Sequence, residues 1–462
     1  MAPRPPTRHG RRGAARRHGL AGPPTPRLDA GAAPRDHPAR PTDDAEAPDA
    51  VRTLLVHPNF PGQYAHLAPA LAARPGARVA AISARRVPVP DGVDLRVYEA
   101  PERQDPSRYG RHFDNAARRA ERAAALALDL RRDGFAPDVV LAHIGWGDAL
   151  FLKDVFPDAR MLLYGEFYYS ALGADVGFDP PGEPVTVQDA MRVRAMNAPM
   201  LSAMAAADWA VSPTRWQRDR FPAWFRARTS LLHDGVDTAL CAPDPSAAFA
   251  LPDGTVLRPG DEVVSYVARG LEPYRGFPTF MRALPAILAA RPAARAVVVG
   301  GDETRYGREP PGGGTWREAM LREVGGGLDP ARVHFTGRVP HPALRALFRV
   351  AAVHVYLTVP FVLSWSVLEA MAIGALVVGS ATPPVEEVIA DGKNGLLVGF
   401  HDPDALARRV VEALADPARF DPLRRAARRT VAERYDLARV CLPRQLGLVD
   451  ALAARRVPPT YA

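Results

Sequence analysis

The sequence predicts an α/β protein of two doubly wound, Rossmann-like domains that face each other across a cleft. Two series of short apolar strands alternate with amphipathic helices, which is the pattern of parallel sheets covered on both faces. The first series begins at residue 53 and the second at residue 262, with a Pro-rich stretch over residues 242–260 between them. At 462 residues the chain is long enough for two such domains, each with its own core.

The first series contains six apolar runs short enough to be buried strands. Between them lie longer segments with helical periodicity, of which the clearest covers residues 107–132. We expect strands at residues 53–56, 78–83, 138–143, 160–165, 209–212 and 229–233, and helices at residues 63–73, 107–132, 147–156 and 187–207.

The second series repeats the alternation. Its strands are rich in Val and its helices carry an apolar stripe, which favours a second parallel sheet. We expect strands at residues 262–267, 296–301, 332–337, 353–358, 375–380 and 395–399, and helices at residues 277–290, 315–324, 341–348 and 366–372.

These patterns set the expected boundaries. Residues 1–50 are rich in Pro, Arg, Ala and Gly and have few large apolar side chains, so we expect a disordered tail. A basic arm that contacts an anionic membrane is the alternative for this tail. Residues 51–240 form the expected N-terminal domain, residues 241–435 the C-terminal domain, and residues 436–462 a final helix and tail.

Composition excludes several classes of protein. The net charge is +8, but arginines are concentrated in the N-terminal tail, and no basic motif of a nucleic-acid binder is present. No apolar run approaches the roughly 20 residues of a membrane span. The chain has two cysteines, Cys241 and Cys441, far apart in sequence. We therefore expect neither a disulfide framework nor a metal site, and a cytoplasmic location.

The most informative segment covers residues 358–399. A Pro- and Ser-containing loop runs into a short helix that carries one carboxylate, Glu369, and a buried strand follows. The N-terminus of such a helix presents free N–H groups that suit a diphosphate. The carboxylate one turn into the helix can accept hydrogen bonds from the two ribose hydroxyls of a nucleotide.

The order of several sequence blocks identifies a family. The chain resembles the family 4 glycosyltransferases, retaining enzymes of the GT-B fold, over about residues 52–440. The blocks that carry the resemblance are HPNFPGQYAHLAPALAAR, SPTRWQRDRFP, LLHDGVDTALCAP, YVARGLEPYRGF, VLEAMAIGALVVGS and VEEVIADGKNGLLV.

The resemblance implies a donor site for a nucleoside diphosphate sugar in the C-terminal domain. Arg269 and Arg275 correspond to the Arg and Lys that contact the donor diphosphate, with Arg275 in the Lys position. Two fixed cations would stabilise the leaving diphosphate without a metal ion or another cofactor. Glu369 corresponds to the second glutamate of the family's Glu-x7-Glu pattern, which binds the ribose. Phe361 stands in the position of the first glutamate, so this chain is a variant.

Backbone groups complete the expected donor site. The N–H groups of Leu363 and Ser364 are candidates to face the diphosphate or the sugar. Gly62 lies in the first strand–helix turn, where it is either a plain turn residue or a point of close backbone approach to the ligand. Gly301 is either part of a tight turn or lies beside the nucleotide, and Val339 lies where relatives hold the base through backbone contacts.

The N-terminal domain supplies the remaining candidates. His143 ends a strand at the position where the family often places a histidine against the donor sugar. Glu166 and Tyr168 follow the next strand, and a carboxylate with aromatic side chains suits an acceptor pocket. We interpret His233, Asp234 and Gly235 as structural, with Gly235 in a turn and Asp237 as the cap of the segment that enters the second domain.

The sequence thus predicts a retaining transferase that moves a sugar from a nucleoside diphosphate donor to the hydroxyl of a glycan, a lipid-linked molecule or a small molecule. Weak peripheral contact with the inner face of the membrane is consistent with relatives that act on lipid-linked glycans. Two alternatives stay open. One is a nucleotide-sugar epimerase or hydrolase on the same fold. The other is a non-catalytic nucleotide-sugar binding protein, which the loss of the first glutamate at Phe361 favours.

Overall fold

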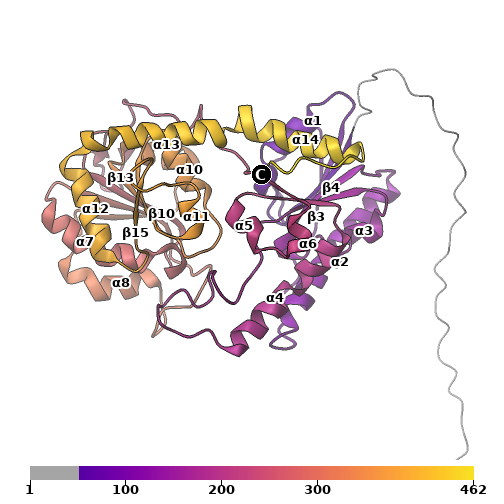
Figure 1. Cartoon of the computed structure of the whole chain (residues 1–462), viewed down its shortest axis with the longest axis horizontal. Helices are drawn as coiled ribbons and strands as arrows, with labels where there is room; N and C mark the ends of the chain where they lie inside the picture. Colours follow the sequence, from indigo (N-terminus) through magenta and orange to yellow (C-terminus); the bar gives the residue numbers. More distant parts are fainter. Residues whose placement is uncertain (1–50, 462) are drawn as a thin grey trace, which may run out of the picture. The chain divides into compact units, whose positions relative to one another are not determined.

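The structure, a computed structural model, describes residues 51–461, which lie within one compact unit. The predicted tail over residues 1–50 lies outside the described residues. Two parallel sheets form two lobes, as the sequence predicts, and each sheet is flanked by helices (Figure 1). We refer to them as the N-terminal and C-terminal lobes.

The N-terminal sheet has seven parallel strands in the order β3-β2-β1-β4-β5-β6-β7. The central strands are buried almost throughout because helices cover both faces. The edge strand β3 was not predicted from the sequence, and most of its residues are partly exposed. The strands are β1 (Arg52–Val56), β2 (Arg78–Ser83), β3 (Val93–Val97), β4 (Val139–His143), β5 (Arg160–Tyr164), β6 (Trp209–Ser212) and β7 (Thr229–Leu231).

Small side chains let long helices lie close to one face of this sheet. Helix α2 (Arg111–Arg132) buries a stripe of alanines at residues 116, 120, 123 and 127, and α4 (Val187–Ala206) adds Met200 and Met204. Four further helices of this lobe are short. They are α1 (Leu67–Ala72), α3 (Leu152–Val155), α5 (Arg215–Arg220) and α6 (Ala223–Arg226), so the helices predicted over residues 63–73 and 147–156 are shorter than expected.

The C-terminal sheet has six parallel strands in the order β12-β11-β10-β13-β14-β15. All six were predicted from their apolar runs. The strands are β10 (Val263–Gly270), β11 (Arg295–Gly301), β12 (Val333–Gly337), β13 (Val353–Tyr356), β14 (Leu376–Ser380) and β15 (Leu396–Val398). A small hairpin of β8 (Phe249–Ala250) and β9 (Val256–Leu257) lies in the predicted linker.

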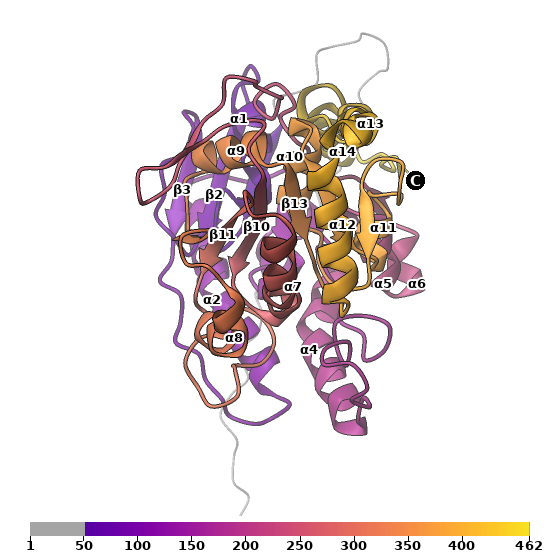
Figure 2. The same cartoon turned by 90° about the vertical axis from the view of Figure 1, so that its left-hand side faces the viewer.

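Helices cover both faces of the C-terminal sheet. On one face, α7 (Phe277–Ala290) and α12 (Pro403–Ala415) share a core cluster with the strands, and Figure 2 shows both helices in front of β10 and β13. Helix α8 (Trp316–Val324) adds Met320 to this cluster. The opposite face is covered by α9 (His341–Val350), α10 (Trp365–Ile373) and α13 (Asp421–Arg434), and the short α11 (Pro383–Glu386) follows β14.

The C-terminal segment returns to the N-terminal lobe. After α13, the π-helix η6 (Leu437–Cys441) leads into α14 (Leu442–Ala453), which lies beside α1 (Figure 1). Leu448 and Leu452 of α14 share a core cluster with Leu71 of α1. Arg74 Nη1 and Asp450 Oδ1 form an ion pair at 2.5 Å. The final helix therefore covers the second face of the N-terminal sheet.

The connection between the lobes begins with the turn predicted at Gly235. This glycine has a φ of +96°, and an added Cβ atom would lie 2.9 Å from the Cα atom of Leu437, so a side chain is excluded. The predicted cap at Asp237 is confirmed, because its Oδ1 accepts hydrogen bonds from the amides of Ala239 and Leu240.

Candidate active site

The site lies where the strand order of each sheet reverses. The N-terminal sheet reverses between β1 and β4, and the C-terminal sheet between β10 and β13. Open α/β sheets bind ligands outside the carboxyl ends of the strands at such points. His143 ends β4, Arg269 lies near the end of β10, and Phe361 follows β13. A cavity of about 460 Å³ is lined by these three residues and by Glu166, which follows β5.

His143 and Glu166 form a polar pair in this cavity. His143 is 2% exposed, and its Nδ1 accepts a hydrogen bond from the amide of Gly145 at 3.0 Å. Its other ring nitrogen, Nε2, lies 3.4 Å from Glu166 Oε2 but has no hydrogen-bond partner in the described part of the chain. Gln63 Nε2 donates to the second carboxylate oxygen of Glu166 at 3.1 Å. The buried imidazole Nε2 thus faces the carboxylate of Glu166 without a hydrogen bond.

Neighbouring cations keep Glu166 ionised. Burial raises the pKa of this carboxyl, but the neighbouring His143 lowers it, followed by the charges of Arg275 and Arg269. The net result is a pKa below the usual value for glutamate. Glu166 can therefore accept hydrogen bonds from substrate hydroxyl groups at neutral pH.

The expected ligand contact at Gly62 is not supported. Gly62 begins the 3-10 helix η1 (Gly62–Tyr64) with a φ of +47°, and an added Cβ atom would lie 2.7 Å from the ring of His57. The space beside this glycine is filled by the histidine ring, so the residue serves the turn. Burial, and then the charge of His143, lower the pKa of His57 to about 3, and its Nδ1 accepts from the amide of Asn59.

The two arginines predicted at the donor diphosphate have different environments. Arg269 is exposed and lines the cavity, and it has no ion-pair partner between residues 51 and 461. Arg275 is half-buried at the end of the 3-10 helix η3 (Pro273–Arg275). Its Nη1 donates to Thr358 Oγ1 at 2.8 Å and to the carbonyl of Val362 at 3.0 Å. Arg269 is free to bind an anion, whereas Arg275 also holds together the loop after β13.

Phe361 is the centre of an aromatic cluster that links the lobes. It is 5% exposed, and its ring lies 4.7 Å from that of Phe167, 5.6 Å from that of Tyr274 and 5.1 Å from that of Tyr306. The guanidinium carbon of Arg275 lies 5.9 Å from the centre of the same ring. The position at which the resemblance implies a carboxylate in relatives is here a packed apolar contact, which was not predicted from the sequence.

The start of α10 is only partly available as an anion site. Ser364 caps the helix, with its Oγ accepting from the amide of Ser366. The amide of Ser364 donates to the hydroxyl of Tyr356 at 2.8 Å, so this predicted donor group is already used. The side chain of Leu363 is buried in the core cluster beneath α10, which leaves only its backbone as a candidate ligand contact.

Glu369 lies apart from the cavity that holds His143. It is the fifth residue of α10 and therefore lies one turn into the helix, as the sequence predicts. Its side chain is 13% exposed, and Oε1 lies 3.9 Å from Nδ1 of His341. Burial raises the pKa of Glu369, and the charges of His341 and Arg345 lower it, with a net increase. Val339, two residues before His341, packs partly against the core, so both predicted nucleoside contacts border α9.

Two further candidates have crowded surroundings. At Gly301 an added Cβ atom would overlap with Oε2 of Glu303 and lie 2.7 Å from Nη2 of Arg338, so the ion pair of these side chains lies against this turn, and the contact with the nucleotide stays a prediction. Tyr168 does not line the cavity. Its ring packs in the N-terminal core beside Phe221, and the neighbouring residues Phe167 and Tyr169 face the cavity instead. Residues 167–169 are all aromatic, so the sequence alone could not show which of them face the cavity.

Asp234 connects the lobes, a role beyond the structural one predicted. Its Oδ2 accepts hydrogen bonds from the hydroxyl of Tyr164 at 2.9 Å and from the indole N–H of Trp365 at 2.8 Å. Tyr164 ends β5 of the N-terminal lobe and Trp365 begins α10 of the C-terminal lobe, so one carboxylate links the two lobes. Burial raises the pKa of Asp234 to about 7, although Trp365 and Tyr164 lower it.

Comparison with known proteins decides the family. The model described as "Glycosyl transferase family 4 group" matches residues 75–241, and the model described as "Glycosyl transferases group 1" matches residues 261–416. The two matches follow each other along the chain and cover most of both lobes. The chain belongs to the family 4 glycosyltransferases. The resemblance seen in the sequence blocks is confirmed.

Relatives within the family are matched over part of their length. The chain is 31% identical over 239 residues to a GDP-mannose-dependent alpha-(1-6)-phosphatidylinositol monomannoside mannosyltransferase of Mycolicibacterium smegmatis. This match covers 50% of this chain and 57% of the relative. The chain is also 28% identical over 234 residues to a D-inositol 3-phosphate glycosyltransferase of Streptomyces avermitilis, and this match covers 49% of this chain and 48% of the relative. The match thus spans about half the length of each relative.

Solved structures share the fold of this family 4 member. A glycosyltransferase from Rickettsia africae has a TM-score of 0.62 at 13% identity, and the match covers 87% of this chain and 99% of the solved chain. Sucrose-phosphate synthase from Thermosynechococcus elongatus has a TM-score of 0.60 at 20% identity and covers 88% and 97%. Anabaena HepE in complex with UDP has a TM-score of 0.59 at 15% identity and covers 88% and 100%. The fold is GT-B, as predicted.

Proposed function

We propose that the protein is a retaining glycosyltransferase that moves a sugar from a nucleoside diphosphate donor to an acceptor hydroxyl. The observation that carries this proposal is the cavity of about 460 Å³ in which His143 and Glu166 of one lobe face Arg269 of the other. A cation, a buried imidazole and an ionised carboxylate thus meet at the strand ends of both sheets. Membership of the family 4 glycosyltransferases supports the same function.

Arg269 and Arg275 would stabilise the leaving diphosphate. Negative charge develops on this group as the glycosidic bond breaks, and fixed donors that await it lower the barrier without reorganisation. Arg275 is fixed by Thr358 and Val362, and Arg269 is unpaired among the described residues. We propose that the two guanidinium groups serve without a metal ion, and the backbone of Leu363 is a further candidate donor.

His143 and Glu166 would handle the sugar and the acceptor. The free Nε2 of His143 suits a hydroxyl group of the donor sugar, and the carboxylate of Glu166 suits the acceptor hydroxyl. We propose front-face attack, in which the leaving phosphate takes the acceptor proton, because Glu166, the one carboxylate among the described residues that line this cavity, is assigned to the acceptor hydroxyl. Glu369 would bind the ribose, and the backbone of Val339 the base.

The relatives support a nucleotide sugar as donor. The Mycolicibacterium smegmatis relative is named as GDP-mannose-dependent, and Anabaena HepE has been solved with UDP and with UDP-glucose. We extend to this chain a nucleoside diphosphate sugar and a glycan, lipid-linked or small-molecule acceptor. Among residues 51–461, none of the helices has the length and apolar character needed to cross a bilayer. A cytoplasmic place with peripheral membrane contact is part of the proposal, supported by the phosphatidylinositol-linked acceptor in that relative's name.

Phe361 favours one competing function, which is nucleotide-sugar binding without turnover. The experiment that separates the two incubates the full chain with a panel of nucleotide sugars and acceptors and measures the released nucleoside diphosphate and the products. Transfer predicts a glycosylated acceptor with retained configuration. Tight donor binding without product across the panel would support the binding protein, and nucleotide release without an acceptor would support a hydrolase.

A further inference from the structure

A second cavity lies on the other side of the aromatic cluster around Phe361. Its volume is about 900 Å³, within the range of about 300–1,000 Å³ for small-molecule sites. Tyr169, Arg305, Tyr306 and Phe361 line both cavities and so form the wall between them. None of the residues with a role in the proposed transfer reaction lines the larger cavity, which is therefore without an assigned role.

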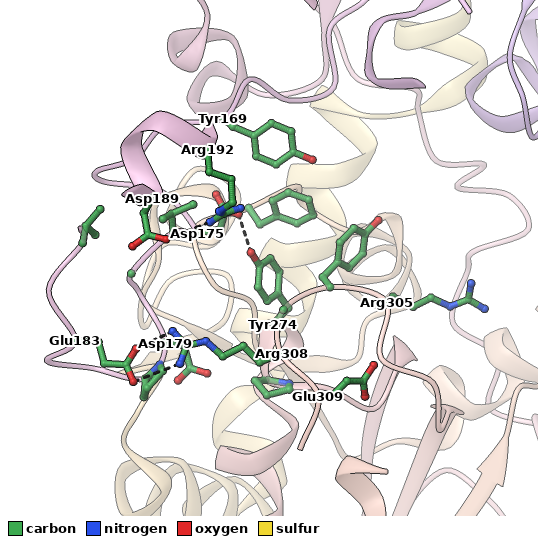
Figure 3. Close-up of a pocket in the computed structure, with 18 of the residues that line it drawn as sticks. Tyr169, Asp175, Asp179, Glu183, Asp189, Arg192, Tyr274, Arg305, Arg308 and Glu309 are labelled. Carbon is green, nitrogen blue, oxygen red and sulfur yellow. Dashed lines mark hydrogen bonds and ion pairs between the residues drawn. The ribbon is translucent and has the colours of Figure 1, made fainter. Parts of the chain in front are cut away.

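Asp175 is the most informative residue of this second cavity. It is 7% exposed, and its Oδ2 accepts a hydrogen bond from the hydroxyl of Tyr274 at 2.7 Å (Figure 3). Its Oδ1 is buried and has no hydrogen-bond partner among residues 51–461. A buried acceptor without a partner destabilises the folded protein. A ligand that donates a hydrogen bond to Oδ1 would remove this destabilisation.

Aromatic side chains line the space around Asp175. The rings of Tyr274 and Tyr306 stack at 5.8 Å with an angle of 23° between their planes. Trp316 also lines the cavity, with its Nε1 donating to the carbonyl of Arg308 at 2.9 Å. The faces of aromatic rings carry partial negative charge and attract polarised C–H groups. A buried hydrogen-bond acceptor beside aromatic faces suits a sugar ring, which has hydroxyl groups on its edge and C–H groups on its faces.

The charges of the second cavity argue against a phosphate group as its occupant. Arg308 is paired with Glu183 at 2.7 Å, and Arg192 lies 3.7 Å from Asp189 (Figure 3). The basic side chains of this cavity are thus balanced by acids, and its one unpartnered buried carboxylate oxygen would repel an anion. The first cavity, by contrast, contains the unpaired Arg269.

We propose that the second cavity binds a neutral sugar residue, which donates a hydroxyl to Asp175 Oδ1 and packs on Trp316 and Tyr274. This site is separate from that of the nucleotide sugar. The bound residue belongs either to the distal part of a glycan acceptor or to a separate glycan, and the chemistry of recognition is the same. The proposal goes beyond the proposed transfer reaction, because binding needs no donor and no turnover.

The test measures binding of neutral trisaccharides built from glucose, mannose or N-acetylglucosamine to the full chain, without nucleotide, by calorimetry and tryptophan fluorescence. At least one trisaccharide should bind saturably. Asp175→Asn should weaken that binding about 10-fold or more, because it replaces the carboxylate that accepts the sugar hydroxyl. Trp316→Leu should also weaken it about 10-fold or more, because it removes the aromatic face on which the sugar packs. Asp148→Asn is the matched control, because Asp148 is another buried carboxylate bonded to a tyrosine, Tyr98, and it lies outside this cavity. Its binding should stay within about 2-fold of the wild type.

Three results would overturn the proposal. They are no binding by any trisaccharide in the panel, unchanged binding by Asp175→Asn, and displacement of the trisaccharide by UDP-glucose or GDP-mannose, which would place the sugar in the donor site. A protein that is inactive in sugar transfer would still bind the trisaccharide in this assay. Failure of the proposed transfer function can therefore be distinguished from failure of the proposed sugar site. The source of the sugar follows from KM values. An Asp175→Asn variant with a raised KM for a trisaccharide acceptor but not for a monosaccharide assigns the site to the acceptor, and equal KM values assign it to a separate glycan.

Discussion

The rings of Phe361 and Phe167 lie edge to face with their centres 4.7 Å apart, and each comes from a different lobe. Phe361 follows β13 of the C-terminal sheet, and Phe167 follows β5 of the N-terminal sheet. The resemblance seen in the sequence blocks implies that relatives hold a glutamate at the position of Phe361. Here an apolar contact fixes the two strand ends relative to each other and divides the space between them into two cavities.

Phe361→Ala should therefore destabilise the protein. Truncation of a buried phenylalanine costs about 3–5 kcal/mol through lost contacts and the cavity that remains. The free energy of unfolding, measured by urea titration, should fall by about this amount. Phe113→Ala is the control, because Phe113 is 43% exposed on α2 and its loss should change stability by about 0.5 kcal/mol or less. Equal effects of the two substitutions would contradict the role of the aromatic contact.

Arg269 and Arg275 should respond differently to replacement by alanine. Both should lower kcat, by about 10²–10³-fold for the loss of one fixed donor to a developing negative charge. Only Arg275→Ala should also lower the melting temperature, because it removes hydrogen bonds to Thr358 and Val362 that fix the loop after β13. Thermal unfolding and initial rates, measured on the same preparations, test this difference. A near-normal rate for Arg269→Ala would refute the charge argument.

The metal independence of the reaction can be tested directly. Because the two guanidinium groups are proposed to offset the charge of the leaving diphosphate, initial rates should be unchanged after dialysis against EDTA. Addition of Mg²⁺ or Mn²⁺ should also leave them within about 2-fold, since no step of the proposal requires a Lewis acid. A rate that falls with EDTA and returns with one metal ion would show that Arg269 and Arg275 are insufficient.

Prediction from the sequence was most accurate where apolar residues recur in a regular pattern. The strands that lead to His143, Glu166 and Arg269 are continuous apolar runs, so both their existence and the meeting of their carboxyl ends could be predicted. The edge strand Val93–Val97 was missed because its side chains are mostly half-exposed and lack such a run.

Contacts between residues far apart in sequence could not be predicted in the same way. The histidine ring against Gly62 and the tyrosine hydroxyl that occupies the amide of Ser364 depend on side-chain orientation. The unpartnered Oδ1 of Asp175 depends on burial by loops of both lobes, and no local pattern encodes it. The orientation of Tyr168 was missed for the same reason.

Glu369→Gln should weaken binding of the nucleoside diphosphate. The side chain is 13% exposed, and no hydrogen-bond donor in the described chain satisfies its carboxylate, since His341 Nδ1 is 3.9 Å away. Ribose hydroxyls would supply those bonds, and hydrogen bonds to a charged group contribute about 1.5–3 kcal/mol. Calorimetry with UDP and GDP should show a Kd increased at least about 10-fold. Glu323→Gln, on the exposed face of α8, is the control, and an unchanged Kd for Glu369→Gln would remove its ribose role.

Asp234 should make stability depend on pH between about 4 and 7. Its carboxyl ionises near pH 4 in the unfolded chain and near 7 in the folded protein, where burial disfavours the charge. Between these values the folded protein keeps a proton that the unfolded chain releases, so the free energy of unfolding falls as the pH rises. The contribution is full below about pH 4 and is lost by about pH 7.

Asp234→Asn removes this titration and isolates it. The free energy of unfolding of the variant, minus that of the wild type, should increase from pH 4 to 7 and stay constant above, because the other ionisable groups contribute to both proteins alike. Trp365→Phe should shift the pH dependence in the opposite direction. It removes the indole N–H that donates to Asp234 at 2.8 Å and favours the charged form, so the pH range over which the free energy of unfolding falls should extend above pH 7. A difference that is flat from pH 4 to 8 in Asp234→Asn would show that this carboxylate is ionised when folded.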